Sequence, residues 1–163
     1  MTEKEQYLAT FEREYPVTLN VLRAYPPAQS ELKPQERCKS ARDLAWNFVF
    51  EGYAALQGLD GEFPFPPKGL PEQPGSWDAA VGVIDGTFKK LGDKVRRTSE
   101  ADLNKTVPFF VGPKQMGDIR RMDLLWFLMM DMIHHRGQLS VYLRMAGGKV
   151  PSIYGPSGDE PWD

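Results

Sequence analysis

Histidine and cysteine, the side chains that most often bind transition metals, are nearly missing from this sequence. The chain of 163 residues contains one cysteine, Cys38, and two histidines, His134 and His135. A single cysteine excludes an intrachain disulfide and a cysteine-rich zinc site. A metal or catalytic site built on these histidines must therefore take most of its other groups from elsewhere in the chain.

The sequence also lacks an excess of positive charge and any long hydrophobic run. Lysine and arginine total 20 against 22 acidic residues, and this balance argues against a nucleic-acid partner. The longest apolar run, LLWFLMM at residues 124–130, is too short to span a bilayer. The first residues, MTEKEQYLATFEREY, are charged and show no signal peptide. We therefore expect a cytoplasmic protein that binds neither nucleic acid nor membrane.

Apolar residues recur at intervals of three and four in four segments, which predicts four amphipathic helices. These helices are expected at about residues 2–24, 40–56, 76–98 and 117–146. Thr2 and Glu5 match a capping box, and Ser76 is a good N-cap. Gly147 and Gly148 should end the last helix. Pro16 lies inside the first helix and should kink or split it.

Two long connections separate the last three helices. Residues 59–75 are rich in proline and glycine, which excludes a regular helix, and a loop of this length is often functional. Residues 98–115 contain an apolar patch, KTVPFFVGPK, that we expect to lie across the helices. No segment alternates with period two for long enough to propose a sheet. The sequence thus predicts an all-α fold, a four-helix bundle forming one domain over residues 1–163 with a packed tail at 147–163.

A candidate site lies in the stretch DMIHHRGQL, residues 131–139. Adjacent helical residues point about 100° apart, so His134 and His135 cannot easily serve one mononuclear site. Asp131 and His135 are four residues apart and share one face, which suits two metal ligands. A third ligand must come from another helix, and the best candidates are Asn47 and Glu51. Such a set suits one divalent ion such as zinc, nickel or iron.

The same residues also permit a site without metal. Asp131 can accept a hydrogen bond from His135, forming a satisfied buried pair that raises the histidine pKa. With so few strong ligands, the residue pattern alone favours this second interpretation. For the neighbouring Arg136 we expect a structural contact with Asp159 or Glu160 of the tail.

Three stretches together resemble the DinB family. HHRGQL at 134–139 and YLRMAGGKVPSIYGPSGDEPW at 142–162 resemble the end of that family's fourth helix and its tail. SARDLAWNFVFE at 40–51 resembles its second-helix motif. The resemblance covers nearly the whole chain. It implies a four-helix bundle with up-down-down-up order and a long crossover connection, often assembled as a homodimer.

The resemblance also implies a metal site that this chain has partly lost. Better-understood members bind a divalent metal through three histidines, one on the second helix and two in an H-x-x-x-H motif on the fourth. Some of them are transferases or isomerases that use low-molecular-weight thiols such as bacillithiol or mycothiol. The three positions correspond to Asn47, Asp131 and His135 here, so only His135 keeps its imidazole.

Two functions of different classes follow. The first is a divalent-metal-dependent thiol transferase or hydrolase-like enzyme with a degenerate site at Asn47, Asp131 and His135. Its substrate would be a small molecule or a low-molecular-weight thiol, in a cleft lined by the second and fourth helices and the EFPFPPKGLP loop. The alternative is a non-catalytic bundle that binds a small apolar ligand or a protein partner. The family's name suggests a damage-inducible protein, but the acidic balance gives DNA binding no support.

Overall fold

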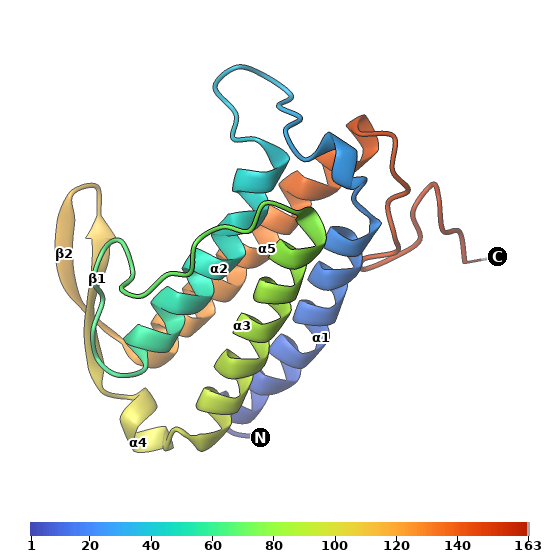
Figure 1. The fold of residues 1–163 in the computed structure, drawn as a ribbon. Coiled ribbons are helices and arrows are strands. Elements are labelled where there is room, and N and C mark those ends of the chain that lie inside the picture. Colours follow the sequence, from blue (N-terminus) through green and yellow to red (C-terminus); the bar gives the residue numbers. More distant parts are fainter. Residues whose placement is uncertain (163) are drawn as a thin grey trace.

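The computed structural model describes residues 1–162 and consists mainly of four long helices packed side by side (Figure 1). These are α1 (Glu3–Ala24), α2 (Ala41–Gly58), α3 (Trp77–Arg97) and α5 (Arg121–Met145). The shorter elements are η1 (Pro27–Gln29), α4 (Glu100–Leu103), β1 (Thr106–Gly112) and β2 (Gln115–Arg120). The predicted helices are confirmed to within two residues at most ends, but the last one begins four residues later than the predicted start at 117.

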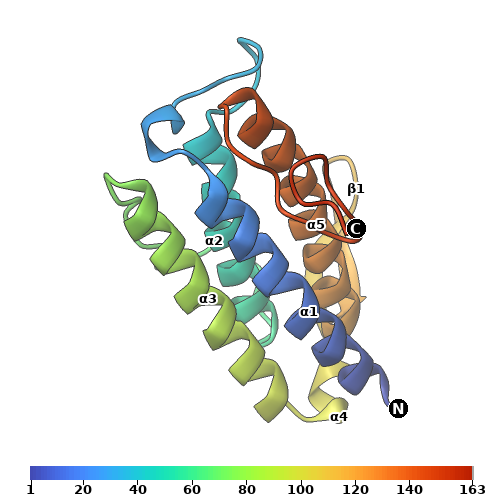
Figure 2. The ribbon, with the colours of Figure 1, turned by 90° about the vertical axis from the view of Figure 1, so that its right-hand side faces the viewer.

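Each long helix packs against two of the others. Both α1 and α2 contact α3 and α5, so α1 and α2 occupy opposite corners of the bundle. In Figure 1, α1 and α5 run upward while α2 and α3 run downward. The connection after α2 returns along the length of the bundle to the start of α3, and Figure 2 shows the same four helices from the side. Within residues 1–162, no helix has the length and apolar character needed to cross a membrane.

The helix ends follow the local sequence signals. Thr2 and Glu5 form the predicted capping box, and the Ser76 side chain caps α3 by accepting from the backbone N–H of Ala79. Gly147 adopts a positive φ of 78° just after α5, a conformation that glycine reaches without steric cost. The predicted split at Pro16 is wrong, because α1 continues through it. Buried side chains on both sides of the proline, including Phe11 and Leu19, hold the helix in the bundle.

The core lies between the four helices. The seam predicted for α3 is buried along its whole length: Trp77, Val81, Ile84, Phe88, Leu91 and Val95. On the facing side of α2, Gly52 lets the helix approach α3 closely. A Cβ atom at Gly52 would lie only 2.4 Å from Cγ2 of Thr87, so a larger residue does not fit without movement.

The prediction of an all-α fold without a sheet is wrong between α4 and α5. β1 and β2 form an antiparallel hairpin in which Val107 lies opposite Ile119 and Phe109 opposite Gly117. Val107 and Phe109 are buried while Phe110 and Val111 are exposed, so the alternation is real but extends over too few residues to stand out. Residues 117–120, assigned to the last helix from the sequence, belong to β2.

A buried polar cluster joins α1, α5 and the C-terminal tail. Nη1 of Arg136 lies 2.9 Å from Oε2 of Glu14, and both side chains are only 2% exposed. Nη2 of Arg136 donates to the hydroxyl of Tyr154 (2.6 Å), which donates to Glu14 (2.8 Å). Burial raises the pKa of Glu14, but the hydrogen bonds from Tyr154 and Arg136 outweigh burial and lower it overall.

The expected contact of Arg136 with Asp159 or Glu160 is therefore wrong. Arg136 lies on the face of α5 that meets α1, and its guanidinium finds the Glu14 carboxylate there. The tail carboxylate Asp159 instead binds Arg144, two turns further along α5, at 2.7 Å.

Candidate metal centre and ligand cleft

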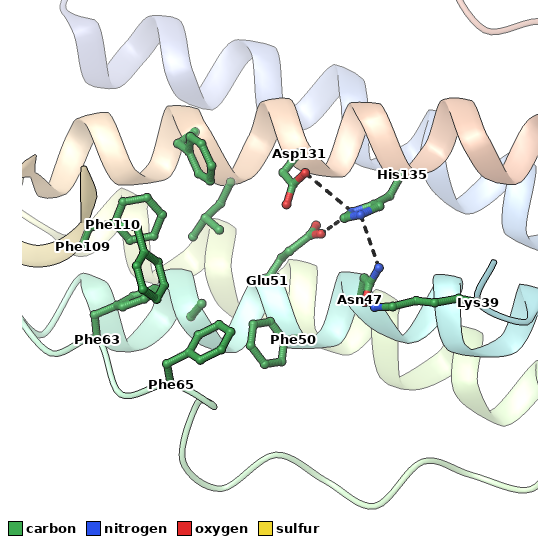
Figure 3. A pocket seen from close by; sticks show the side chains of 13 residues that line it. Lys39, Asn47, Phe50, Glu51, Phe63, Phe65, Phe109, Phe110, Asp131 and His135 are labelled. Carbon is green, nitrogen blue, oxygen red and sulfur yellow. Dashed lines mark hydrogen bonds and ion pairs between the residues drawn. The ribbon is translucent and has the colours of Figure 1, made fainter. Parts of the chain in front are cut away.

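Polar side chains of α2 and α5 meet in the interface between these two helices (Figure 3). Asn47 and Glu51 are four residues apart on α2, and Asp131 and His135 are four residues apart on α5. The i, i+4 spacing places each pair on one face of its helix. All four point into the same space, because the two faces are turned toward each other.

The imidazole of His135 is the centre of this cluster. Its Nδ1 lies 2.5 Å from Oε1 of Glu51 and 3.9 Å from Oδ1 of Asp131. Its Nε2 lies 3.3 Å from the amide nitrogen of Asn47. The Asn47 oxygen accepts a hydrogen bond from Nζ of Lys39 at 2.7 Å, so the amide presents its N–H to the ring. In the neutral imidazole, Nε2 is then the acceptor and the ring proton lies on Nδ1, facing Glu51.

Burial and charge shift the pKa values of this pair in the same direction. Burial raises the pKa of Glu51 to about 7, although the hydrogen bond and positive charge of His135 act against it. Burial lowers the pKa of His135, but the hydrogen bond to Glu51 and the charges of Glu51 and Asp131 outweigh it and raise the pKa overall. The pair therefore holds a proton near neutral pH.

The cluster fits a divalent cation. One ligand atom each from Glu51, Asp131 and His135 lies within 4.8 Å of the other two. The second carboxylate oxygen of Glu51, Oε2, is buried and has no hydrogen-bond partner. An unpaired buried carboxylate oxygen is costly, and a cation bound there would satisfy it. Two carboxylates and one imidazole are a donor set that divalent transition metals accept.

The two helices expected from the sequence to supply the site, α2 and α5, are the ones whose side chains meet here. The resemblance selected Asn47 as the α2 ligand, whereas Glu51 lies closer to His135. Asn47, Asp131 and His135 do lie together, and the role of Asn47 as a ligand stays a prediction because its oxygen bonds to Lys39. Glu51, named as a candidate from its spacing, makes the closer contact with His135. His134 points elsewhere on α5, and its Nε2 lies 3.0 Å from the amide nitrogen of Gln138.

A cleft of about 310 Å³ opens beside the polar cluster. The cluster and Lys39 line one end, and phenylalanines line the other (Figure 3). The phenylalanines are Phe50, Phe63, Phe65, Phe109, Phe110 and Phe127. Helices α2 and α5 and the EFPFPPKGLP loop line this cleft as predicted. The contribution of β1 was missed, because the hairpin itself was not foreseen.

A second cleft, of about 520 Å³, lies on the other side of Asn47 and His135. Its walls include Cys38, whose side chain is half-buried, and Tyr142, whose hydroxyl donates to the backbone oxygen of Lys39 at 3.3 Å. Lys39, Asn47 and His135 line both clefts, so these three side chains form the partition between them.

Comparison with known proteins confirms the resemblance found in the sequence. The model of the DinB family matches residues 94–162. The fold is similar to that of the DinB-like protein YjoA from Bacillus subtilis (TM-score 0.73, 19% identity, 97% of this chain and 99% of that one). It is also similar to a DinB-like protein from Bacillus cereus ATCC 10987 (TM-score 0.76, 22% identity, 92% and 97%).

One curated sequence is similar over a shorter stretch. It is the uncharacterised protein YrdA of Bacillus subtilis (strain 168), which is 54% identical over 38 residues. The match spans 23% of this chain and 23% of YrdA, so less than a quarter of either protein is compared.

Proposed function

Since residues 94–162 match the DinB family and the fold is that of DinB-like proteins, we propose that this protein is a small divalent-metal-dependent enzyme, a thiol transferase or a hydrolase. Glu51, Asp131 and His135 bind the ion. The observation that carries this proposal is Oε2 of Glu51, a buried carboxylate oxygen without a partner at the centre of a cluster of metal-ligating groups. A hydrogen-bonded pair without metal leaves that oxygen unsatisfied, whereas a cation does not.

The residues around the centre have separate tasks. A divalent cation supplies Lewis acidity, which activates a water or thiol nucleophile and polarises a carbonyl group. Without metal, Glu51 and His135 share a proton through Oε1 and Nδ1, and a bound ion would displace that proton as the two side chains become ligands. Nζ of Lys39 donates to the Asn47 oxygen and so fixes the orientation of that amide. The positively charged side chain of Lys39 also lines both clefts. A substrate seated against the phenylalanines would be shielded from water on that side.

The donor set constrains the metal. Zinc, nickel and iron(II) accept an imidazole with carboxylates, and we propose one of them as the bound ion. Carboxylate oxygens are harder ligands than imidazole nitrogens. Compared with three histidines, a set with two carboxylates should therefore have a weaker preference for these metals over manganese(II). Asn47 is proposed as a further oxygen ligand, once its amide turns away from Lys39.

A homodimer is the proposed assembly. Large apolar side chains outside the cleft follow one side of α5 and are exposed in the single chain: Met130, Val141 and Met145. An exposed apolar stripe of this kind marks a contact surface, and α5 is long enough to pair with its counterpart in a second copy. Light scattering of the wild type and of Met130→Lys tests this, and an unchanged monomer mass for both contradicts it.

Metal content is the direct test of the proposed function. Protein purified without chelator or affinity-tag metal should contain about one equivalent of a divalent ion by elemental mass spectrometry. Added zinc, nickel, iron(II) or manganese should raise the melting temperature of the depleted protein. Both effects should be lost in Glu51→Gln and His135→Ala.

His134→Ala is the matched control, because His134 is the neighbouring imidazole and points away from the cluster. It should keep the metal and the thermal shift. No bound ion and no shift in the wild type would instead favour the non-catalytic bundle that binds an apolar ligand in the same cleft.

A further inference from the structure

Exposed phenylalanines gather at one place on this protein. The side chains of Phe65, Phe110 and Phe127 are 65%, 41% and 46% exposed, and all three line the cleft beside the polar cluster. A folded chain rarely leaves large apolar side chains together in water unless they contact a partner or ligand. We propose that the cleft binds an aromatic ring of the substrate and directs the substrate's polar, reacting group toward Glu51, Asp131 and His135. The orientation of that group rests on the proposed function, and the binding of the ring does not.

The cleft walls come from segments that are far apart in the sequence. Phe63 and Phe65 belong to the proline-rich loop after α2, and Phe109 and Phe110 belong to β1. The helix bundle does not require these two segments to meet, since neither forms part of a long helix. Their aromatic side chains nevertheless converge over the same end of α2 and α5 (Figure 3).

The ring geometry favours an aromatic guest. Phe63 and Phe109 are 4.7 Å apart between centroids and 77° apart in plane, and Phe65 and Phe110 are 5.5 Å and 88° apart. Phe109 and Phe127 have centroids 5.1 Å apart at 66°. The lining therefore presents both ring edges and ring faces. Another aromatic ring can complete the same edge-to-face pattern, which an alkyl chain cannot do.

Size and polarity define the rest of the ligand. The cleft volume of about 310 Å³ is roughly twice that of a cavity that accepts benzene. It therefore holds one aryl ring and a short linker. The aromatic end offers no polar side chain, whereas the other end offers two carboxylates, an imidazole, an amide and Lys39. The ligand class is an aryl-alkyl compound with a single oxygen-bearing head group, such as a carbonyl or carboxylate.

The test uses three hydroxamic acids that share a metal-binding head group and differ in their tails. Acetohydroxamate has no tail, octanohydroxamate has an alkyl tail, and 4-phenylbutanohydroxamate has an aryl tail of similar hydrophobicity. We would measure their dissociation constants by calorimetry on the metal-loaded protein. The aryl compound should bind at least about 30-fold more tightly than acetohydroxamate and about 5-fold more tightly than octanohydroxamate. Equal affinities for the aryl and alkyl tails would overturn the aromatic preference.

Substitutions in the cleft lining test whether the aryl tail of the ligand binds there. Phe65→Ser and Phe110→Ser should each remove most of the gain from the aryl tail and leave acetohydroxamate binding unchanged. Both side chains are exposed, so the fold should tolerate these changes. Val111→Ser is the matched control, because Val111 is exposed on the same strand and does not line the cleft. Equal losses in all three variants would contradict the proposal.

A head-group-free probe separates this inference from the proposed function. 4-Phenylbutan-1-ol should bind the metal-depleted wild type and lose affinity in Phe65→Ser, whether or not the protein ever binds a metal. Such binding in a protein that takes up no ion would support the aromatic cleft and refute the metal-dependent enzyme. Metal binding without any effect of the phenyl group would refute the aromatic cleft alone.

Discussion

Oε1 of Glu51 lies 2.5 Å from Nδ1 of His135, while the other oxygen of the same carboxylate is buried without a hydrogen-bond partner. The two groups share a proton, and their surroundings raise both pKa values. Because of this contact, the stability of the metal-free protein should depend on pH. A metal ion that binds here must also displace the shared proton.

Stability of the metal-free protein should fall as the pH rises. The pKa of Glu51 is raised from 4.5 to about 7, so its contribution is fully present below 4.5 and is lost as pH rises through 7. The contribution of His135 is present below 6.5 and is lost through its raised pKa. Urea unfolding at pH 5 and 8 should show a fall on the order of 1–3 kcal/mol that is absent in Glu51→Gln. Parallel pH profiles for the two proteins would show that the pair is not responsible.

Metal affinity should change with pH in the opposite sense. Bound metal needs Glu51 and His135 without their shared proton, so binding releases it. We expect the affinity for zinc to rise roughly tenfold per pH unit below the pKa of the pair and to level off above it. Competition titrations against a chelator of known affinity at pH 6, 7 and 8 measure this slope. A flat profile would mean that these two side chains are not ligands.

A histidine at Asn47 should strengthen the centre. The Asn47 amide already lies 3.3 Å from the His135 ring, so an imidazole there would add a second nitrogen donor beside Glu51 and Asp131. We expect Asn47→His to raise zinc affinity by about tenfold or more, because imidazole is a better zinc ligand than an amide. Asn47→Ala, which removes the amide without adding a ligand, is the comparison variant. Equal zinc affinities in the two variants would place position 47 outside the centre.

Arg136 should be essential for stability. Arg136→Met leaves the buried carboxylate of Glu14 without its cation, which costs about 3–5 kcal/mol. The double variant Arg136→Met, Glu14→Met should recover part of this loss, because no unpaired charge remains. Arg144→Met is the control, since its ion pair with Asp159 is more exposed and should cost under about 1 kcal/mol. Similar unfolding free energies for both single variants would contradict this ranking.

Two glycine substitutions should have opposite effects. Gly52→Ala places a Cβ 2.4 Å from Cγ2 of Thr87, so the Thr87 side chain or the two helices must shift, and stability should fall by about 1–3 kcal/mol. Gly82 is exposed within α3 and has nothing within 4 Å of an added Cβ. Gly82→Ala should therefore stabilise the protein by about 0.5–1 kcal/mol through helix propensity. Thermal and urea unfolding measure both, and a stable Gly52→Ala would show that the helices have room to move.

The helices were predictable because their signals are local. Apolar side chains recur every three or four residues along α1, α2 and α3, and the caps at Thr2 and Ser76 need only the next few residues. The hairpin was missed because its alternation is brief and contains Pro108, which weakens a strand pattern. The continuous helix at Pro16 reflects tertiary packing that no local rule contains.

The candidate site was predictable only in part. The spacing of Asp131 and His135 indicates that they share a face, and the line through Asn47 and Glu51 indicates the partner helix. Which of those two lies nearer to His135 depends on how α2 is offset along α5, and that offset depends on packing along the whole bundle. The proline-rich loop was expected to line the cleft, but its contact with β1 through Phe63 and Phe109 joins two connections without periodicity, so no pattern predicted the part of the cleft that β1 supplies.

His135 and Arg136 are consecutive, so their side chains leave α5 about 100° apart around its axis. Arg136 is held by Glu14 of α1 and by Tyr154 of the tail, and these contacts determine how far α5 can turn. Any rotation that carried His135 away from Glu51 would also pull a guanidinium out of a buried ion pair. The C-terminal tail thus helps to orient an imidazole that leaves α5 on a different face, and shortening the tail should loosen that orientation.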